Sequence, residues 1–275
     1  MRLRDYLKDK LTEGELSMLK TGYDTVGSIA IIEVPDELKS KEDVIAEGVL
    51  KINRQVKTVV KKVGIHSGEF RLQKVKVIAG ENTKETEYKE NNVRIKLDVE
   101  KVYFSPRLST ERKRISELVK KGESVLIMFS GCAPYVCVIA KNTKAKEVYG
   151  IEINPLAHKY GKENIRVNKV QNAMLFLGDV KKVVPKLKKK FDRIAMPLPR
   201  SAEDFLDVAL KAIKKKGTIH FYDFEEEKDL PNKAFEKIQK ACKKAKKRCK
   251  IILWRKCGQY GPRKFRVVAD FKVMN

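Results

Sequence analysis

The sequence predicts an α/β fold: a doubly wound, mainly parallel sheet with a smaller N-terminal α+β domain. From about residue 123, short apolar runs alternate with amphipathic segments to the end of the chain. Most of these runs are continuously apolar, which is typical of parallel strands buried on both faces. Residues 1–100 instead hold several short strand candidates and one helix. We therefore expect two domains, residues 1–105 and residues 106–275.

The N-terminal part is expected to combine short strands with one long helix. The helix is predicted over residues 41–62, because apolar residues from Val44 to Val60 recur at helical spacing. A further helix over residues 107–120 leads into the larger domain. The strand candidates are SIAIIEV (28–34), KVKVIAG (74–80), ETEYKENN (85–92) and VRIKLDV (93–99).

The larger domain should hold a sheet whose strands are joined mainly by helices. The predicted strands are residues 124–131, 147–154, 173–179, 191–199 and 218–224, with a closing hairpin at 250–260 and 264–273. The predicted helices are residues 134–143, 155–169, a Lys-rich segment after 179, 201–214 and 231–247. The fourth strand must end abruptly, because Pro197 and Pro199 each lack a backbone donor. This stiff loop is either an ordinary β–α connection or a rigid wall beside a bound base.

The charge points to a polyanionic partner. Lys and Arg number 61 against 36 Asp and Glu, a net charge of +25. Nucleic acid is the obvious polyanion, and a generally Lys-rich surface is the alternative. The sequence has no long apolar run and no apolar signal core at its start, so we expect no membrane association and a cytoplasmic location. Because the five cysteines lack Cys-x-x-Cys spacing and the three histidines lie far apart, we expect buried free thiols and no metal.

Three residues at the ends of consecutive predicted strands suggest a cofactor site. Gly131 follows the first strand, Glu152 ends the second and Asp179 ends the third. The glycine permits close backbone approach, and an acid at the second strand end accepts hydrogen bonds from ribose hydroxyls. Neither a dinucleotide-type glycine motif nor a phosphate-binding loop is present. Each acid alone could be a solvated loop residue, but together they favour a nucleoside cofactor without phosphate, best S-adenosylmethionine.

Several longer motifs resemble one enzyme family. VYFSPRLSTERKRI, VLIMFSGCAPY, YGIEINPLAHKYGKENIRVNK, GDV, MPLP and GTIHFYDF occur in register with the archaeal and eukaryotic tRNA (guanine-N1)-methyltransferases. The resemblance covers residues 65–275. It implies a seven-stranded class I methyltransferase sheet, methylation of the guanosine beside the anticodon (position 37), and a chain that acts as a monomer on the anticodon arm. The separate N-terminal tRNA-elbow domain of many relatives is expected to be absent.

The resemblance also implies roles for individual residues. The cofactor pocket would be lined by Phe129, Gly131, Glu152, Ile153 and Asp179, with Tyr103 and Arg107 facing both cofactor and target base. Glu111 would be the general base, and Arg71 would steady the oxygen of the base. Pro197 and Pro199 would form one side of the base slot, with Pro197 where the family has an asparagine.

These roles suit the chemistry of the reaction. Guanine N1 must lose a proton, which a carboxylate accepts, while a guanidinium stabilises the charge that grows on the base oxygen. The base must also be splayed out of the anticodon arm. Alternatively, Glu111 and Arg107 are an ion pair four residues apart on one helix, and the proton leaves to Asp223 or to water.

Three other functions remain open from the sequence. A sister family, the tRNA wyosine aminocarboxypropyltransferases, shares the body and cofactor but transfers the other alkyl arm. SPRLSTER and MPLP favour methyl transfer, because that family tends to lose this arginine and this loop. The chain could also be an RNA-binding homologue without chemistry, or a methyltransferase for another nucleotide or for rRNA.

Overall fold

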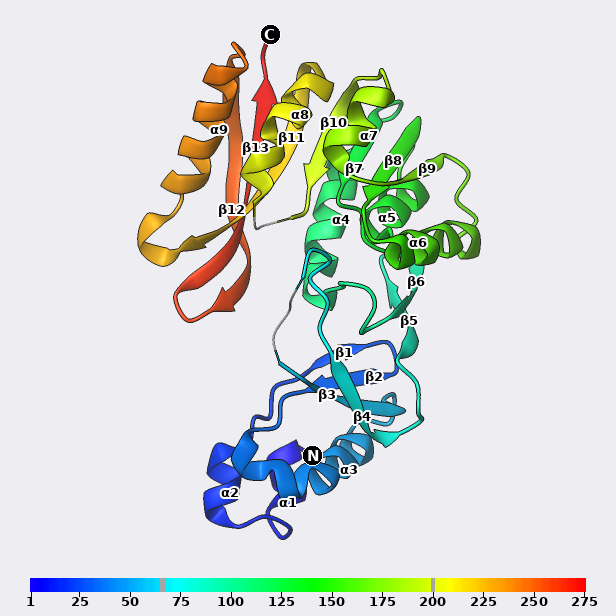
Figure 1. The fold of residues 1–275 in the computed structure, drawn as a ribbon, viewed down its shortest axis with the longest axis vertical. Helices are drawn as coiled ribbons and strands as arrows, with labels where there is room; N and C mark the ends of the chain where they lie inside the picture. The colour runs from blue at the N-terminus through cyan, green and yellow to red at the C-terminus, as the bar shows by residue number, and fades with distance from the viewer. Residues whose placement is uncertain (65–67, 199–200) are drawn as a thin grey trace. The chain divides into compact units, whose positions relative to one another are not determined.

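The computed structural model describes residues 1–64, 68–198 and 201–275, and it divides into two compact units (Figure 1). The first unit comprises residues 1–90 and 94–106, and the second comprises residues 91–93 and 107–275. Within the described residues, no helix is long and apolar enough to cross a membrane. The same residues contain no group of three or more His, Cys, Asp or Glu side chains that could hold a metal ion.

The first unit packs three short helices beside a four-stranded sheet. The helices are α1 (Leu3–Leu7), α2 (Glu13–Met18) and α3 (Glu42–Ile52), with a 3-10 turn at Asp36–Lys41. The sheet order is β1 (Asp24–Val26), β2 (Ile29–Ile32), β3 (Thr58–Lys62) and β4 (Val75–Gly80), while β5 (Glu85–Glu90) and β6 (Val93–Asp98) form a separate pair. Gly48 of α3 permits close approach of α1, since a Cβ there would lie 3.0 Å from the Leu3 side chain.

The long helix predicted over residues 41–62 was wrong in its second half. Helix α3 ends at Ile52, and residues 58–62 form β3, which pairs with β2 in parallel and with β4 in antiparallel fashion. Thr58, Val59 and Val60 are fully buried in this central strand. A strand buried on both faces is continuously apolar or β-branched. Apolar residues therefore also occupy the positions that a continuation of helix α3 would bury, so the helical pattern of the sequence extends through β3.

The second unit is built on the predicted seven-stranded sheet, which confirms the doubly wound, mainly parallel fold. Its order is β12–β13–β11–β10–β7–β8–β9. The strands are β7 (Ser124–Met128), β8 (Glu147–Glu152), β9 (Ala173–Leu177), β10 (Phe191–Met196), β11 (Ile213–Glu226), β12 (Cys249–Gly261) and β13 (Lys264–Val273). Strands β7 to β11 pair in parallel, and β13 pairs antiparallel with both β11 and β12. The predicted closing hairpin is thereby confirmed.

The helices of the second unit form two groups around the sheet. They are α4 (Ser109–Leu118), α5 (Pro134–Asn142), α6 (Pro155–Val167), α7 (Val180–Lys186), α8 (Leu206–Ala212) and α9 (Asn232–Lys244). Helices α4, α5 and α6 contact one another in succession, and so do α7, α8 and α9. The helix predicted over 201–214 is shorter, because a 3-10 turn precedes α8 and β11 already begins at Ile213.

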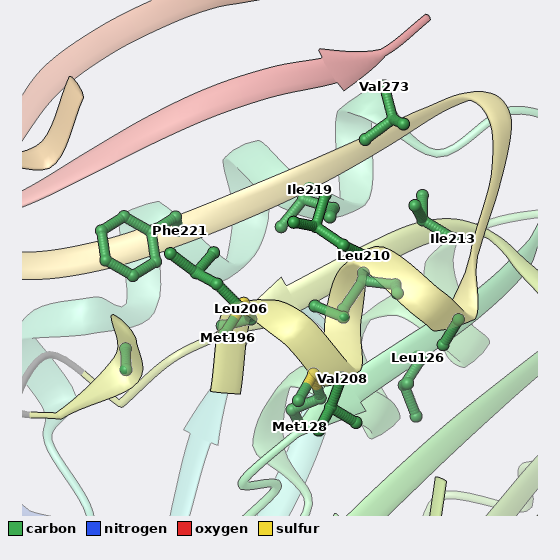
Figure 2. Close-up of a cluster of buried hydrophobic side chains, with 14 of the residues drawn as sticks. Leu126, Met128, Met196, Leu206, Val208, Leu210, Ile213, Ile219, Phe221 and Val273 are labelled. Atoms are coloured by element: carbon green, nitrogen blue, oxygen red, sulfur yellow. The ribbon is translucent and has the colours of Figure 1, made fainter. Parts of the chain in front are cut away.

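A hydrophobic core cluster of this unit lies between the sheet and helices α7, α8 and α9, and Figure 2 shows its part around α8. Leu206 and Leu210 of α8 are almost completely buried against side chains of β7, β10 and β11. Met128, at the end of β7, and Met196, at the end of β10, belong to this cluster and are fully buried. The backbones from which the candidate site loops leave are therefore held rigidly.

Two of the five cysteines differ from the prediction of free thiols. Cys242 in α9 and Cys249 at the start of β12 form a disulfide, with their Cα atoms 6.4 Å apart. The seven-residue spacing carries no signal for this pairing, because only the turn from α9 into β12 brings the two residues together. Cys132 and Cys137 are buried free thiols, as predicted, while the free thiol of Cys257 is partly exposed.

Candidate active site

The first strand of the parallel sheet ends in a tight backbone turn. Phe129, Gly131 and Ala133 have φ angles of 64°, 58° and 66°, so alternate residues adopt the left-handed conformation. The turn lies at the carboxyl end of β7, where the strand order reverses between β8 and β10. In open α/β sheets this switch point is where ligands bind.

Glu152 ties the ends of β7 and β8 together. Its Oε2 accepts a hydrogen bond from the backbone N–H of Gly131 at 2.6 Å, and its Oε1 accepts one from that of Asn154 at 2.8 Å. Burial raises the pKa of Glu152, and these backbone hydrogen bonds oppose the rise. The structure therefore brings together two of the residues that the sequence predicted for the cofactor site, Gly131 and Glu152.

Two asparagines that the sequence analysis did not assign to the site support this turn. Asn154 is the N-cap of α6, and its Oδ1 accepts from the N–H groups of Leu156 and Ala157. Asn164, which is fully buried in α6, donates from Nδ2 to the carbonyl of Cys132 at 2.9 Å. Both lie within the YGIEINPLAHKYGKENIRVNK motif, so the motif itself was the signal that could have found them.

The remaining residues predicted for the cofactor site lie on neighbouring loops. The ring of Phe129 packs edge-on against Phe205, with centroids 4.8 Å apart. Asp179 caps α7 by accepting from the N–H of Lys181 at 2.8 Å. Ile153 follows β8 and Pro197 follows β10, and both are partly exposed. Pro199 lies outside the described residues.

The glycine turn also contains a buried polar atom that a ligand could satisfy. Ser130 is 3% exposed, and its Oγ has no hydrogen-bond partner among the residues that the structure describes. Buried hydroxyls normally have a partner. The unsatisfied hydroxyl after β7 and the partly buried carboxylate of Glu152 at the end of β8 fit a nucleoside-bearing cofactor.

Glu111 is held by two other side chains. It lies in the first turn of α4, is only 4% exposed, and forms a bidentate ion pair with Arg114 at 2.9 Å (Nε to Oε2) and 2.7 Å (Nη2 to Oε1). The hydroxyl of Tyr222 on β11 also donates to Oε1 at 2.7 Å. Tyr135 of α5, in turn, lies 3.4 Å from the Tyr222 hydroxyl. The expected carboxylate is thus buried and paired with Arg114, three residues along the helix.

A network of hydrogen-bonded side chains extends from Arg114 to residues of the sheet. Arg114 donates from Nη1 to Oδ2 of Asp270 on β13 at 2.6 Å. Asp270 lies 2.6 Å from Nδ1 of His220, and Nε2 of His220 lies 2.8 Å from Nη1 of Arg193. Arg193 is anchored by Glu123, whose Oε2 accepts from Nε at 2.8 Å. Since Arg193 can only donate, Nε2 of His220 accepts and Nδ1 carries the proton that is donated to Asp270.

This arrangement predicts acid-sensitive stability in the second unit. Burial lowers the pKa of His220, with Asp270 opposing the fall and Arg193 and Arg114 adding to it. The unfolded state therefore binds a proton more readily, and the free energy of unfolding should fall as the pH drops below about 6.5, by up to about 1.4 kcal/mol per unit. Trp254, the single tryptophan, lies on β12 and reports unfolding of this unit by fluorescence.

Denaturant titrations of the wild type and His220→Asn between pH 5 and 8 test this expectation. Asparagine does not titrate, so the variant should show a shallower loss of stability below pH 6.5. Equal pH slopes for the two proteins would show that His220 does not change its protonation on unfolding.

The first unit contains a cavity of about 120 Å³ that includes two other predicted site residues. Arg71 and Tyr103 both line it, together with Lys62, Gln73 and Asp24. Arg71 has a φ of 54°, which is rare for a residue other than glycine and places it in a tight turn. Arg107 belongs to the second unit, in the 3-10 turn Pro106–Leu108 before α4, and is exposed. Asp223, the alternative proton acceptor, is buried and lies 2.6 Å from Nζ of Lys237.

Comparisons with known proteins agree with this fold. Residues 86–252 match the model of the TRM5/TYW2 methyltransferase domain, and residues 3–83 match that of the TYW2 N-terminal domain. The similarity thus extends into the first unit, beyond the residues 65–275 that carried the sequence resemblance. Over 255 residues the chain is 41% identical to "tRNA (guanine(37)-N(1))-methyltransferase Trm5b" of Pyrococcus abyssi, covering 93% of this chain and 76% of the relative.

A second relative carries the alternative activity in its name. The chain is 33% identical to the "tRNA(Phe) (4-demethylwyosine(37)-C(7)) aminocarboxypropyltransferase" of Methanocaldococcus jannaschii, covering 91% of this chain and 97% of the relative. Among solved structures, the complex of aTrm5 with tRNALeu matches with a TM-score of 0.88 and 33% identity, covering 100% of this chain and 78% of that one. TYW2 of M. jannaschii in complex with AdoMet matches with a TM-score of 0.71 and 28% identity, covering 92% and 100%.

The fold and the strand-end site together define a class I methyltransferase, whose cofactor is S-adenosylmethionine. Within that class, the chain belongs to the TRM5/TYW2 methyltransferase family.

Proposed function

We propose that this chain transfers a methyl group from S-adenosylmethionine to N1 of guanosine 37 in tRNA. The observation that carries this proposal is the 41% identity over 93% of the chain to a relative named for that reaction. The motif residues expected for it are present, and Glu111, the expected base, is a buried carboxylate. S-adenosylmethionine supplies an electrophilic methyl group, so the protein must bind tRNA, expose guanine N1 and remove its proton.

Glu111 is the proposed proton acceptor. Its three hydrogen bonds, two from Arg114 and one from Tyr222, occupy three of about four acceptor positions of a carboxylate. Among the residues that the structure describes, one position on Oε2 is left for the N1–H of guanine. Burial of the carboxylate favours transfer, because it removes the competing water.

Arg71 and Tyr103 are proposed to hold the base. A guanidinium placed at the base oxygen stabilises the negative charge that grows there as N1 loses its proton. The cavity of the first unit, which both residues line, is of a size to admit part of a planar base. By the family resemblance, Arg107 would steady the cofactor or base, and Pro197 of the MPLP loop would form one side of the base slot. We further propose that the substrate contact is the anticodon arm, and that one chain in the cytoplasm suffices.

Mass spectrometry of nucleosides from tRNA incubated with protein and S-adenosylmethionine tests the reaction. We expect N1-methylguanosine. A product with an aminocarboxypropyl group would assign the chain to the sister activity. Methyl on another nucleotide, or on rRNA alone, would change the substrate. tRNA binding without any product would identify a homologue without chemistry.

The tRNA complex should be strongly salt-dependent. A net charge of +25 should neutralise several phosphates, and each contributes about 0.7–0.9 to the slope of log affinity against log salt. We therefore expect a slope of about −3 or steeper in filter binding or fluorescence titrations. A slope near zero would show that the basic excess is only a solvated surface.

A further inference from the structure

We propose that Arg114, steered by Asp270 on the last strand, is a positioning residue that orients the Glu111 carboxylate. The proposal rests on the proposed function, in which Glu111 is the base. It concerns two residues that were given no role above: Arg114, and Asp270, which lies in the closing hairpin 159 residues beyond Glu111 in the sequence.

The first argument is the sharing of one guanidinium between two carboxylates. Arg114 directs Nε and Nη2 to Glu111 and Nη1 to Asp270, and Nη2 also donates to Oδ1 of Asp270 at 3.3 Å. All three side chains are buried or nearly so. The planar fork fixes the plane of the carboxylate that it binds in bidentate fashion. Glu111 is therefore presented in one orientation, with its remaining acceptor position on Oε2.

The second argument is that Asp270 is itself held in place. His220 and Asp270 lie directly opposite each other in the antiparallel pair β11–β13, and their side chains are 2.6 Å apart. Arg193 accepts no hydrogen bond and so keeps the imidazole proton on the Asp270 side. Burial would raise the pKa of Asp270, but His220 and Arg114 together outweigh it and hold this pKa at about 2, so Asp270 is ionised throughout the neutral range. A simple surface ion pair between Arg114 and Glu111 would not require Asp270, His220 and Arg193 to hold the guanidinium in place.

The third argument concerns the charges that face Glu111. The titratable or charged groups around it are Arg114 and Arg112 of α4, Tyr135 of α5, Tyr222 of β11, Cys257 of β12 and, through Arg114, Asp270 of β13. Burial raises the pKa of Tyr135, Tyr222 and Cys257, that of Cys257 to about 12, so all three are neutral at neutral pH. The charged groups around Glu111 at neutral pH are therefore the two arginines and Asp270.

Two substitutions should move the acid limb of the pH–rate profile, which is the fall of the methylation rate at low pH, in opposite directions. Asp270→Asn removes a negative charge and with it the carboxylate that steers the fork of Arg114, so the positive charge of Arg114 acts on Glu111 without opposition and the limb moves to lower pH. Arg114→Met removes the positive charge, so the limb moves to higher pH by about one unit or more. Both variants should lower the plateau rate by about tenfold or more, because Glu111 loses its orientation.

The measurement is the single-turnover rate of guanosine methylation between pH 5 and 9, at saturating tRNA and S-adenosylmethionine. Asp192→Asn is the matched control: Asp192 also pairs with a cation and a backbone N–H, but at the amino end of β10, and its variant should keep the wild-type profile. Arg114→Lys keeps the charge without the fork, so it should retain the wild-type acid limb with a lowered plateau. Trp254 fluorescence verifies that each protein is folded.

The outcomes separate this inference from the proposed function. Shifts of opposite sign for Asp270→Asn and Arg114→Met support it. A slow Glu111→Gln variant, together with unshifted limbs in folded Asp270→Asn and Arg114→Met and a wild-type plateau in Arg114→Lys, overturns the positioning role alone. A Glu111→Gln variant at the wild-type rate overturns the base assignment, and the positioning role with it.

Discussion

Replacing Glu111 by glutamine is expected to slow single-turnover methylation of guanosine 37 by about 10²–10⁴, the usual contribution of a general base. Glutamine keeps the shape and one acceptor oxygen, so the hydrogen bond from Tyr222 can persist. It cannot take the proton from guanine N1 at neutral pH. The affinity for tRNA, measured separately by filter binding, should change little.

The matched control lies on the same helix. Glu117 of α4 is exposed and pairs with Lys113, so Glu117→Gln changes the same charge without touching the buried network. It should retain the wild-type rate. If Glu111→Gln is as fast as Glu117→Gln across neutral pH, the proton leaves by another route and Glu111 only forms a structural ion pair with Arg114.

Replacing Glu152 by alanine should weaken S-adenosylmethionine binding by about 100-fold. Two charge-assisted hydrogen bonds to the ribose would be lost, at about 1.5–3 kcal/mol each. The loss of the acceptor for the Gly131 N–H also releases the turn after β7, which adds to the effect. Calorimetric titration of each protein with S-adenosylmethionine measures the change directly.

Glu147, at the other end of β8, supplies the control for this strand. It accepts hydrogen bonds from Ser124 and Lys189, far along the strand from the turn, so Glu147→Ala should bind the cofactor normally. Unchanged affinity in Glu152→Ala would remove Glu152 from the cofactor site. Equal losses in both variants would indicate general destabilisation of β8 instead.

The sheet shows which elements the local pattern of apolar residues could predict and which it could not. The parallel strands were recognisable because each is a short, continuously apolar run followed by an amphipathic helix. The helix predicted across residues 41–62 failed for the same reason: β3 is buried on both faces, and a fully apolar run fits either period. The decision between helix and strand there came from its pairing with β2 and β4.

The sequence by itself determined the family, the fold class and the residues at the strand ends, because motifs such as EINP and SPRLSTER are local strings. Only the tertiary structure decided what Glu111 touches. Its partner Arg114 is three residues away, but Tyr222 comes from β11, and Asp270, which binds Arg114, comes from β13. Likewise, Cys242 meets Cys249 only through a turn. Such pairings follow from sheet order and register, which bring distant residues within about 3 Å of one another in a buried environment where a charged group needs partners.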